Sequence, residues 1–331
     1  MALLLKVDNL ATYFYTRGGI VKAVDGISFE VASGETIALV GESGCGKTIS
    51  ALSILRLLPE SQCKIASGQA LFDGVDLLKA SEKEMRKVRG GNISMVFQET
   101  MTSLNPVLTI GRQISEVLEL HQNMKRRETF QEAIRLLKLV GIPQAERRMK
   151  DYPHHFSGGM RQRVMIAIAI SCQPKLIIAD EPTTAVDVTI QTQLLELLRG
   201  ITRELNTSLI LITHNLGIVA RYAQRVYVMY AGRIVEHGQA RDVYHCPGHP
   251  YTAGLLASVP RLDEPRKTRL TPVGGQPPDP LYPPAGCTFQ PRCTYAVPQC
   301  QGSKVDFVEI TSGHYSSCCL ARNGVTPWKK T

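Results

Sequence analysis

Short apolar runs broken by turn residues occupy the start of the chain. Residues 3–7 and 28–31 are apolar or alternate between apolar and polar, and residues 36–40 form a β-rich run that ends in glycine. This pattern predicts antiparallel strands at the N-terminus and a buried strand at 36–40. Residues 49–58 predict a helix that Pro59 ends.

The middle of the chain is rich in helix formers. Residues 114–121 and 128–139 predict helices. They lie within a helical insertion of about residues 100–165. Sheet signals return at 176–179 and 208–213, with a predicted helix at 191–205 between them. Alternation of strand and helix predicts a mostly parallel, doubly wound α/β core.

Prolines crowd the chain from residue 247 to residue 298. Little regular structure is expected at such density. We therefore expect residues 1–246 to form the main domain and residues 247–331 to form a proline-rich arm and a small module separate from the core. The prolines are Pro247, Pro250, Pro260, Pro265, Pro272, Pro277, Pro278, Pro280, Pro283, Pro284, Pro291 and Pro298.

The composition and the lengths of the apolar runs indicate where in the cell the protein is expected. The chain of 331 residues is 44% hydrophobic and carries a net charge of +9, without a long basic run. Its most apolar run, residues 164–170, is far shorter than the roughly 20 residues of a membrane helix. The first residues lack the pattern of a signal peptide. We expect the chain to stay in the cytoplasm and to reach a membrane only through a partner.

The run GESGCGKT over residues 41–48 follows a predicted strand and opens a predicted helix. That is the context of a phosphate-binding loop. Its glycines let backbone N–H groups curl around an anion, and the helix N-terminus adds a favourable dipole. Lys47 is expected at the β- and γ-phosphates and the Thr48 hydroxyl at Mg²⁺. A chance glycine-rich turn is the ordinary alternative.

Two carboxylates end the buried strand predicted at 176–179. Asp180 is expected to hold the Mg²⁺ hydration shell, and Glu181 to orient and polarise the attacking water. Acidic residues often end strands, so the pair becomes informative only because it lies downstream of a phosphate loop.

The run FSGGM over residues 156–160 resembles the signature motif of ABC ATPases. Gln98 resembles the glutamine of that family's Q-loop, Asp187 its D-loop aspartate and His214 its switch histidine. Phe14 stands where the family stacks an aromatic ring on adenine, with Tyr13 as the neighbouring candidate. The order of these motifs along residues 1–240 identifies the chain as a member of the ABC ATPases, with their α/β fold.

The resemblance implies a head-to-tail dimer in which each ATP lies between the phosphate loop of one subunit and the signature motif of the other. ATP closes the dimer and hydrolysis reopens it. Catalysis is assigned to Glu181, His214, Lys47 and Gln98, and Mg²⁺ to Thr48, Gln98 and Asp180. The residues assigned to ATP are Phe14, Gly41, Ser43, Gly44, Cys45, Gly46, Lys47, Thr48, Ile49, Ser157, Gly158, Gly159 and Asp187.

Three positions depart from the family's common form. Met160 replaces a glutamine in the signature, Asn215 follows the histidine where aspartate is frequent, and Val186 replaces leucine in the D-loop. None of these changes removes a catalytic group. A regulatory subunit that binds nucleotide without turnover is therefore disfavoured.

The tail resembles the ATP-binding subunits of oligopeptide/dipeptide importers. The resemblance lies in residues 249–252 and 286–293 and in the run MTSLNP at 101–106. It implies two permease subunits, a second related ATPase in a heterodimer, an extracytoplasmic solute-binding protein, and a place on the cytoplasmic face of the cell (inner) membrane. Relatives that carry nickel or other small solutes are one alternative. A soluble ABC protein acting on nucleic acid or the ribosome is another, but such proteins usually carry two cassettes or coiled-coil insertions.

Five of the nine cysteines lie in the tail. In a reducing compartment such a cluster indicates a metal rather than disulfides, and four thiolates can hold a [4Fe–4S] cluster or Zn²⁺. Spacing alone does not choose between these and unliganded thiols. The resembled family carries a [4Fe–4S] cluster here, and its last ligand follows a histidine by four positions, as Cys318 follows His314. The ligands so implied are Cys287, Cys293, Cys300 and Cys318.

Cys45 has a different environment. Its backbone N–H in the phosphate loop is expected to matter more than its sulfur. An oxidation-sensitive thiol is the alternative, because a helix N-terminus lowers the pKa of a nearby thiol.

Overall fold

The computed structural model describes residues 2–99, 103–182, 187–259, 272–302, 305–323 and 328. Met101 and Thr102 of the MTSLNP run, Val186 of the D-loop, and Pro260 and Pro265 of the arm lie outside the described residues. The chain divides into two compact units: residues 1–2, 32–35 and 79–212 form unit 1, and residues 3–31, 36–78 and 213–331 form unit 2.

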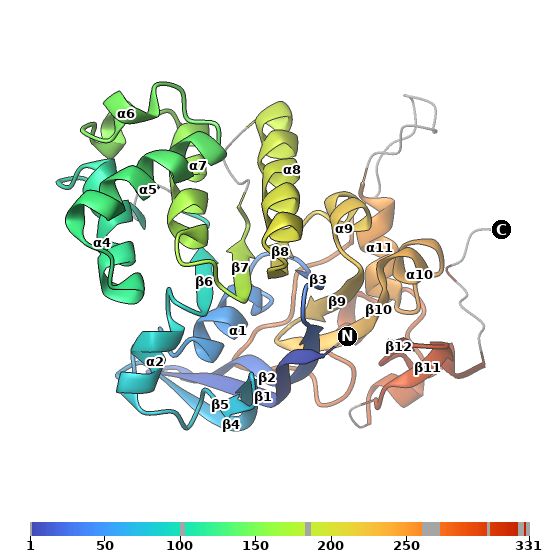
Figure 1. The fold of residues 1–331 in the computed structure, drawn as a ribbon. Coiled ribbons are helices and arrows are strands. Elements are labelled where there is room, and N and C mark those ends of the chain that lie inside the picture. The colour runs from blue at the N-terminus through green and yellow to red at the C-terminus, as the bar shows by residue number, and fades with distance from the viewer. Residues whose placement is uncertain are drawn as a thin grey trace. The chain divides into compact units, whose positions relative to one another are not determined.

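Unit 1 joins a parallel sheet to a group of helices (Figure 1). Strand β7 (Leu176–Asp180) lies between β6 (Ile93–Val96) and β8 (Ser208–Thr213), and pairs in parallel with both. Every residue of β7 and β8 is buried, as expected of strands covered on both faces. The helices are α2 (Glu82–Val88), α4 (Ile110–Gln122), α5 (Arg126–Leu139), α6 (Ala145–Arg148), α7 (Gly158–Ile170) and α8 (Val188–Glu204).

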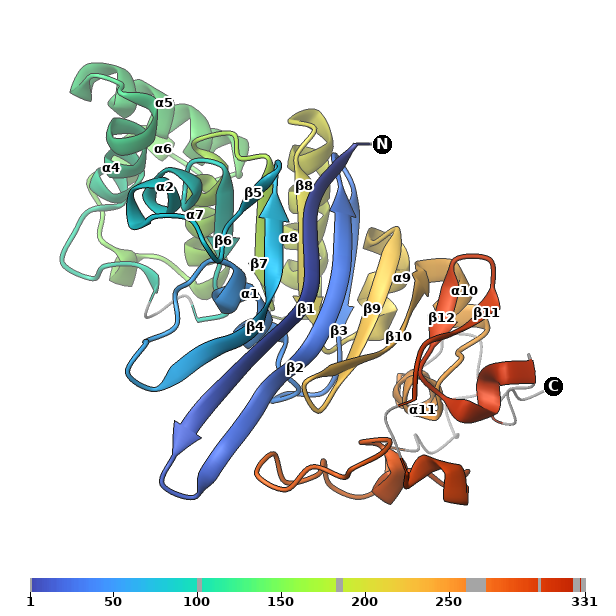
Figure 2. The same cartoon turned by 90° about the horizontal axis from the view of Figure 1, so that it is seen from below.

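Unit 2 contains two groups of strands, seen from below in Figure 2. One sheet is antiparallel and has the order β2-β1-β4-β5. In the other group, β3 pairs in parallel with β9, and β10, β12 and β11 follow in antiparallel pairs. The strands are β1 (Leu3–Thr16), β2 (Gly19–Ala32), β3 (Thr36–Val40), β4 (Cys63–Phe72), β5 (Val75–Asp76), β9 (Arg225–Tyr230), β10 (Arg233–Gln239), β11 (Val308–Thr311) and β12 (His314–Ser316). The helices are α1 (Lys47–Ile54), α9 (Leu216–Tyr222), α10 (Ala240–His245) and α11 (Pro250–Ala257).

The sequence located most of these elements but misjudged two. Helix α1 ends at Ile54 rather than near Pro59, because Arg56 takes a left-handed conformation with φ 50°. Helix α11 lies in the proline-rich stretch where little regular structure was expected. Pro250 occupies the first turn of α11, where a missing N–H costs nothing, and the His249 side chain caps the helix.

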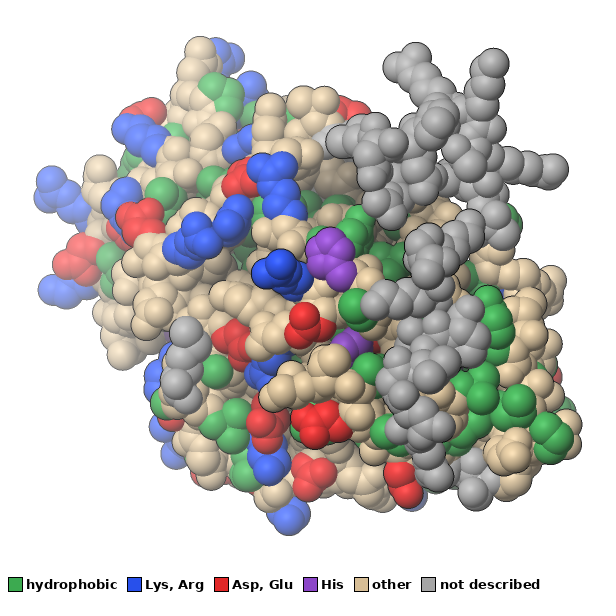
Figure 3. Space-filling view, turned by 90° about the vertical axis from the view of Figure 1, so that its right-hand side faces the viewer, with side chains coloured by type: hydrophobic (Ala, Val, Ile, Leu, Met, Phe, Trp, Pro, Cys, Tyr) green, Lys and Arg blue, Asp and Glu red, His purple; other side chains and the backbone are tan. Residues whose placement is uncertain are grey.

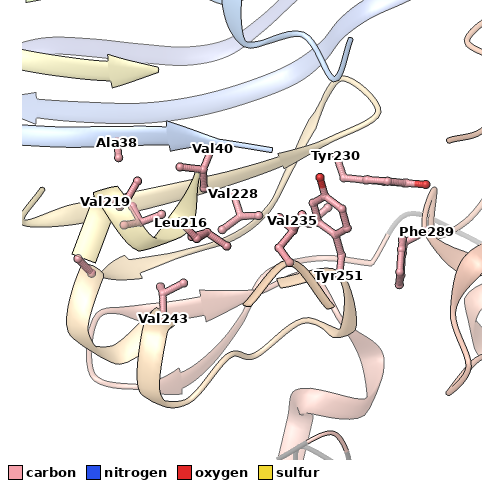
Figure 4. Close-up of a cluster of buried hydrophobic side chains, with 13 residues drawn as sticks. Ala38, Val40, Leu216, Val219, Val228, Tyr230, Val235, Val243, Tyr251 and Phe289 are labelled. Atoms are coloured by element: carbon pink, nitrogen blue, oxygen red, sulfur yellow. The ribbon is translucent and has the colours of Figure 1, made fainter. Parts of the chain in front are cut away.

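The tail does not pack apart from the rest of unit 2. Tyr251 and Phe289 are buried in the same apolar cluster as Ala38 and Val40 of β3 (Figure 4). Strand β12 also pairs with β10. Tail residues thus share an apolar cluster with β3, although the proline pattern led us to expect a module apart from the core. The domain boundary at residue 246 stays a prediction.

Candidate functional site

The phosphate loop of unit 2 connects β3 to α1, as the sequence predicted. Gly44 and Gly46 have φ values of 80° and 105°, a region that only glycine enters without strain. A Cβ atom on Gly46 would lie 2.4 Å from the carbonyl oxygen of Ala23. Glycine is therefore required for both the backbone conformation and the close packing of the loop.

Lys47 is held over its own loop. Its ammonium group is buried and donates hydrogen bonds to the carbonyl oxygens of Gly41 (2.8 Å) and Glu42 (2.9 Å). Thr48 and Ile49 follow in the first turn of α1, half-buried. The loop thus holds one buried cation against Gly41, Glu42 and Cys45.

Two opposing effects act on the pKa of the Cys45 thiol. Its sulfur lies 3.8 Å from the Lys47 ammonium group, which favours the thiolate. Burial is the larger effect and raises the pKa of Cys45. Desolvation therefore opposes the cation, and the raised pKa disfavours the oxidation-sensitive alternative.

Two neighbouring aromatic residues near the end of β1 have different environments. The Tyr13 hydroxyl donates a 2.9 Å hydrogen bond to Asp25, which also pairs with the Arg233 guanidinium at 2.6 Å. Because successive side chains of a strand point to opposite faces, the half-buried Phe14 ring lies on the other face of β1. Tyr13 thus belongs to a hydrogen-bonded network with Asp25 and Arg233, and Phe14 does not.

In unit 1, the two carboxylates lie at the end of β7. Asp180 and Glu181 are both buried, with 2% and 9% of their surface exposed. Glu181 has a φ of 43°, which is uncommon for a residue with a Cβ, although its N–H still donates to the Ile212 carbonyl at 2.9 Å. The exposed Gln98 donates a 3.2 Å hydrogen bond to the Glu181 carboxylate. The structure therefore joins two residues 83 positions apart that the sequence had assigned separately to catalysis.

The signature residues form the N-terminus of α7. Ser157 is the N-cap, and its hydroxyl accepts a hydrogen bond from the N–H of Met160 at 3.4 Å. Ser157 and Gly158 are exposed, and Gly159 is half-buried. An exposed helix N-terminus that begins with serine and two glycines can receive an anion on its backbone N–H groups.

Asp187 and His214 also lie at the ends of regular elements. Asp187 caps α8 by accepting a 3.0 Å hydrogen bond from the N–H of Ile190. His214 is exposed and directly follows β8. Asn215 caps α9 by accepting from the N–H of Gly217 at 2.9 Å. Asparagine and aspartate are equally good caps, so the departure at residue 215 costs the helix little.

Comparison with known proteins assigns the family. Residues 24–184 match the family described as ABC transporter, and residues 235–300 match the family described as oligopeptide/dipeptide transporter, C-terminal region. The chain is 51% identical to the oligopeptide transport ATP-binding protein AppD of Bacillus subtilis, over 97% of both chains. It is 52% identical to the dipeptide transport ATP-binding protein DppD of the same organism, over 97% of this chain and 95% of that one. This chain belongs to the ABC transporter family.

Solved structures of ABC cassettes share the fold of this family member. The dimeric post-hydrolysis structure of the ATP-binding cassette MJ0796, bound to ADP and Pi, covers 72% of this chain and 99% of that one, with a TM-score of 0.65 and 25% identity. The ABC ATPase fold predicted from the motif order is confirmed. No helix of the described ranges is long and apolar enough to cross a membrane.

The five tail cysteines of this ABC protein line one cavity of about 10 Å³, together with His249 and Phe289. The Cys300 and Cys319 sulfurs are 3.7 Å apart, and burial raises the pKa of the Cys318 thiol to about 12. Among the described residues, no group of three or more His, Cys, Asp or Glu side chains has the geometry to hold a metal ion. The five thiols thus line one cavity, and the assignment of four of them to a metal stays a prediction. The cysteines are Cys287, Cys293, Cys300, Cys318 and Cys319.

His249 adds an unsatisfied donor to this cavity. Its Nδ1 accepts a hydrogen bond from the N–H of Tyr251, which places the proton of the neutral ring on Nε2. That buried Nε2 has no hydrogen-bond partner. Burial lowers the pKa of His249 to about 3, so the ring stays neutral. His314, which the resemblance linked to Cys318, is instead engaged by the buried Glu236 carboxylate at 2.8 Å.

Sequence reasoning missed one residue that contacts the phosphate loop. The Arg292 guanidinium donates two hydrogen bonds to the Glu42 carboxylate, at 2.7 and 3.0 Å. Arg292 lies in a run that carried the resemblance to importer ATPases, but nothing in the sequence linked it to Glu42. Elsewhere, acidic and basic side chains lie interspersed on the face shown in Figure 3, the arrangement of an ordinary solvated surface.

Proposed function

We propose that this chain is the ATP-hydrolysing motor subunit of a membrane importer for dipeptides and oligopeptides. The observation that carries the proposal is an intact phosphate loop and a Gln98–Glu181 pair in a chain that matches oligopeptide and dipeptide transport ATP-binding proteins along almost its whole length. Nickel or another small solute is the competing cargo.

Each assigned residue has a role that fits its environment. Lys47 and the backbone N–H groups of the loop bind the phosphates, and Phe14 stacks on the adenine. Thr48, Gln98 and Asp180 would hold Mg²⁺, which would supply charge neutralisation at the phosphates. Glu181, oriented by Gln98, accepts a proton from the attacking water, and His214 stabilises the γ-phosphate.

A second subunit completes the mechanism. Ser157, Gly158 and Gly159 of one subunit bind the γ-phosphate held by the other, so ATP favours the closed dimer and hydrolysis releases it. The partners are a related ATPase in a heterodimer, two permease subunits and an extracytoplasmic solute-binding protein. The chain then works at the cytoplasmic face of the membrane.

Uptake by the reconstituted complex tests the function. The complex with its permeases, in proteoliposomes loaded with ATP and Mg²⁺, should accumulate a labelled tripeptide delivered by the binding protein. Glu181→Gln should abolish uptake, and Glu132→Gln, at a half-buried carboxylate of α5 that pairs with Arg135, should not. Uptake of Ni²⁺ but no peptide would support the competing cargo.

We further propose that the tail thiols hold a [4Fe–4S] cluster through Cys287, Cys293, Cys300 and Cys318. Five thiols lining one cavity supply the right donor chemistry, and the unpartnered Nε2–H of His249 can donate to a sulfur there. The cavity is only about 10 Å³, so binding requires the thiols to move apart. Iron, sulfide and zinc analysis after anaerobic purification tests the proposal: about four irons and four sulfides support the cluster, one zinc supports the alternative, and no metal rejects both.

A further inference from the structure

Arg292 holds an acidic residue of the phosphate loop with a two-pronged ion pair. Its guanidinium nitrogens lie 2.7 and 3.0 Å from the two carboxylate oxygens of Glu42. The Arg292 side chain is only 3% exposed and the Glu42 side chain 28%. Two parallel hydrogen bonds from a buried guanidinium fix the orientation of the Glu42 carboxylate as well as balancing its charge, whereas a fully exposed ion pair does neither reliably.

Arg292 is itself held rigidly. Its remaining donors bind the carbonyl oxygens of Gly274 (2.8 Å) and Val273 (3.1 Å) and the Tyr230 hydroxyl (3.3 Å). The guanidinium also lies over the Tyr230 and Phe289 rings, with 5.7 and 5.8 Å to their centroids. The hydrogen bonds to Glu42 are the largest of the effects that raise the pKa of Arg292. The guanidinium thus acts as a fixed clamp rather than a mobile surface cation.

A second contact holds the backbone of the same residue. The N–H of Glu42 donates a 2.8 Å hydrogen bond to the hydroxyl of Tyr251. Tyr251 is fully buried and packs against Tyr230 and Phe289, with ring centroids 4.6 and 5.4 Å away (Figure 4). A cavity of about 240 Å³ borders the loop at Glu42, Ser43 and Gly44. The hydrogen bonds of Glu42 to Arg292 and Tyr251 therefore hold the loop on the side where it borders the cavity.

The clamp is part of the cysteine segment. Arg292 directly precedes Cys293, and Phe289 follows Cys287 by two positions. The N–H of Cys293 donates to Gln290, and the N–H of Gln290 donates to Cys287, so the short turn between the two cysteines sets the position of the guanidinium. Whatever orders these cysteines also orders the clamp.

We propose that Arg292 is a positioning residue for ATP binding, through which the cysteine segment holds the phosphate loop in its binding conformation. The inference rests on the proposed ATPase function. Arg292 neutralises the Glu42 carboxylate, which would otherwise repel the incoming triphosphate. It also orders the loop before the nucleotide arrives, so less conformational entropy is lost on binding. Because Arg292 does not touch the reacting atoms, its effect falls on affinity.

The test measures KM and kcat for ATP hydrolysis, and the Kd for Mg²⁺-ATP. Arg292→Ala should raise KM and Kd about tenfold and change kcat less than about threefold, since the loss is in binding rather than in the chemical step. Arg292→Lys should have KM and Kd values between those of Arg292→Ala and the wild type, because lysine keeps the charge and loses the two-pronged hydrogen bonding of the guanidinium. Arg89→Ala removes an ion pair of unit 1, with Glu82, and should change neither constant.

A double variant distinguishes a role of Arg292 in positioning the phosphate loop from a role in the stability of the fold alone. In Arg292→Ala the unpaired Glu42 carboxylate is the source of the repulsion, so adding Glu42→Gln should lower KM again by several-fold. Added salt should also lower the KM of Arg292→Ala, by screening that charge. The inference is overturned if the double variant has a higher KM for ATP than either single variant. It is also overturned if KM is unchanged in folded Arg292→Ala and Arg292→Lys. A wild-type chain that binds no Mg²⁺-ATP overturns the proposed function and this inference together.

Discussion

The side-chain amide of Gln98 lies 3.2 Å from the Glu181 carboxylate, to which it donates a hydrogen bond. Glu181 is buried and its backbone has a positive φ of 43°, whereas Gln98 is exposed. The amide therefore fixes the orientation of a buried carboxylate. Such an arrangement suits a general base whose orientation depends on an exposed residue.

Glu181→Gln should bind ATP and fail to hydrolyse it. The substitution keeps the shape of the side chain and removes the proton acceptor, so we expect phosphate release to fall by at least about 100-fold. ATP should then trap a closed dimer, visible by size-exclusion chromatography with ATP and absent with ADP. Glu132→Gln is the control. Unchanged turnover in Glu181→Gln would remove Glu181 from the mechanism.

Ser157→Ala should lower turnover more than the loss of a helix cap explains. Ser157 caps α7 and Thr109 caps α4 with the same kind of hydrogen bond, 3.4 and 3.3 Å long. Each alanine variant should lose about 1 kcal/mol of unfolding free energy in urea. Only Ser157→Ala should also lower kcat, by tenfold or more, because its hydroxyl and helix N-terminus serve the γ-phosphate. Equal kcat values in the two variants would assign Ser157 a structural role alone.

Cys318→Ser should lose iron, and Cys319→Ser should retain it. Both sulfurs line the tail cavity, but the resemblance implies Cys318 as the fourth ligand. Burial raises the pKa of Cys318 to about 12, so that thiol ionises only when a metal replaces its proton. Iron per chain after anaerobic purification is the measurement. Cys172→Ser, at a buried thiol of unit 1, is the control, and loss of iron in Cys319→Ser alone would reverse the assignment.

His237 should make the protein less stable as the pH falls below 6.5. Burial lowers the pKa of the folded-state ring from 6.5 to about 4, and Tyr227 and Tyr315 stack on it at 5.4 and 4.9 Å. Between these pKa values the unfolded chain binds the proton and the folded chain does not. The neutral ring's contribution is therefore present above pH 6.5 and lost as the pH falls towards 4.

His237→Phe keeps the stacked ring and removes the proton site. Wild-type protein should lose about 2 kcal/mol of unfolding free energy through this residue between pH 7.5 and 5, and the variant should lose that much less. Urea unfolding at the two pH values measures the difference. His245→Phe, at an exposed residue of α10, should behave as the wild type. Identical pH dependence in His237→Phe would show that the ring titrates normally in the fold.

The sequence alone determined the features that depend on neighbouring residues. The phosphate loop, the strand that ends in Asp180 and the serine cap of α7 are contiguous motifs, in which the local backbone carries the chemistry. The periods of apolar residues also located β3, β7, β8, α4 and α5. In these elements the apolar side chains that produce the period are the ones buried in the fold, so the sequence pattern was enough to find them.

Only the tertiary structure decided how the distant parts of the chain meet. Glu42 and Arg292 lie 250 residues apart, and each looks like an ordinary surface charge until the fold pairs them. The tail could not be placed from its prolines, because Tyr251 and Phe289 become buried only against strands from the other end of the chain. Burial likewise raised the pKa of Cys45 against its local setting, because desolvation depends on every atom packed around a group and not on its neighbours in sequence.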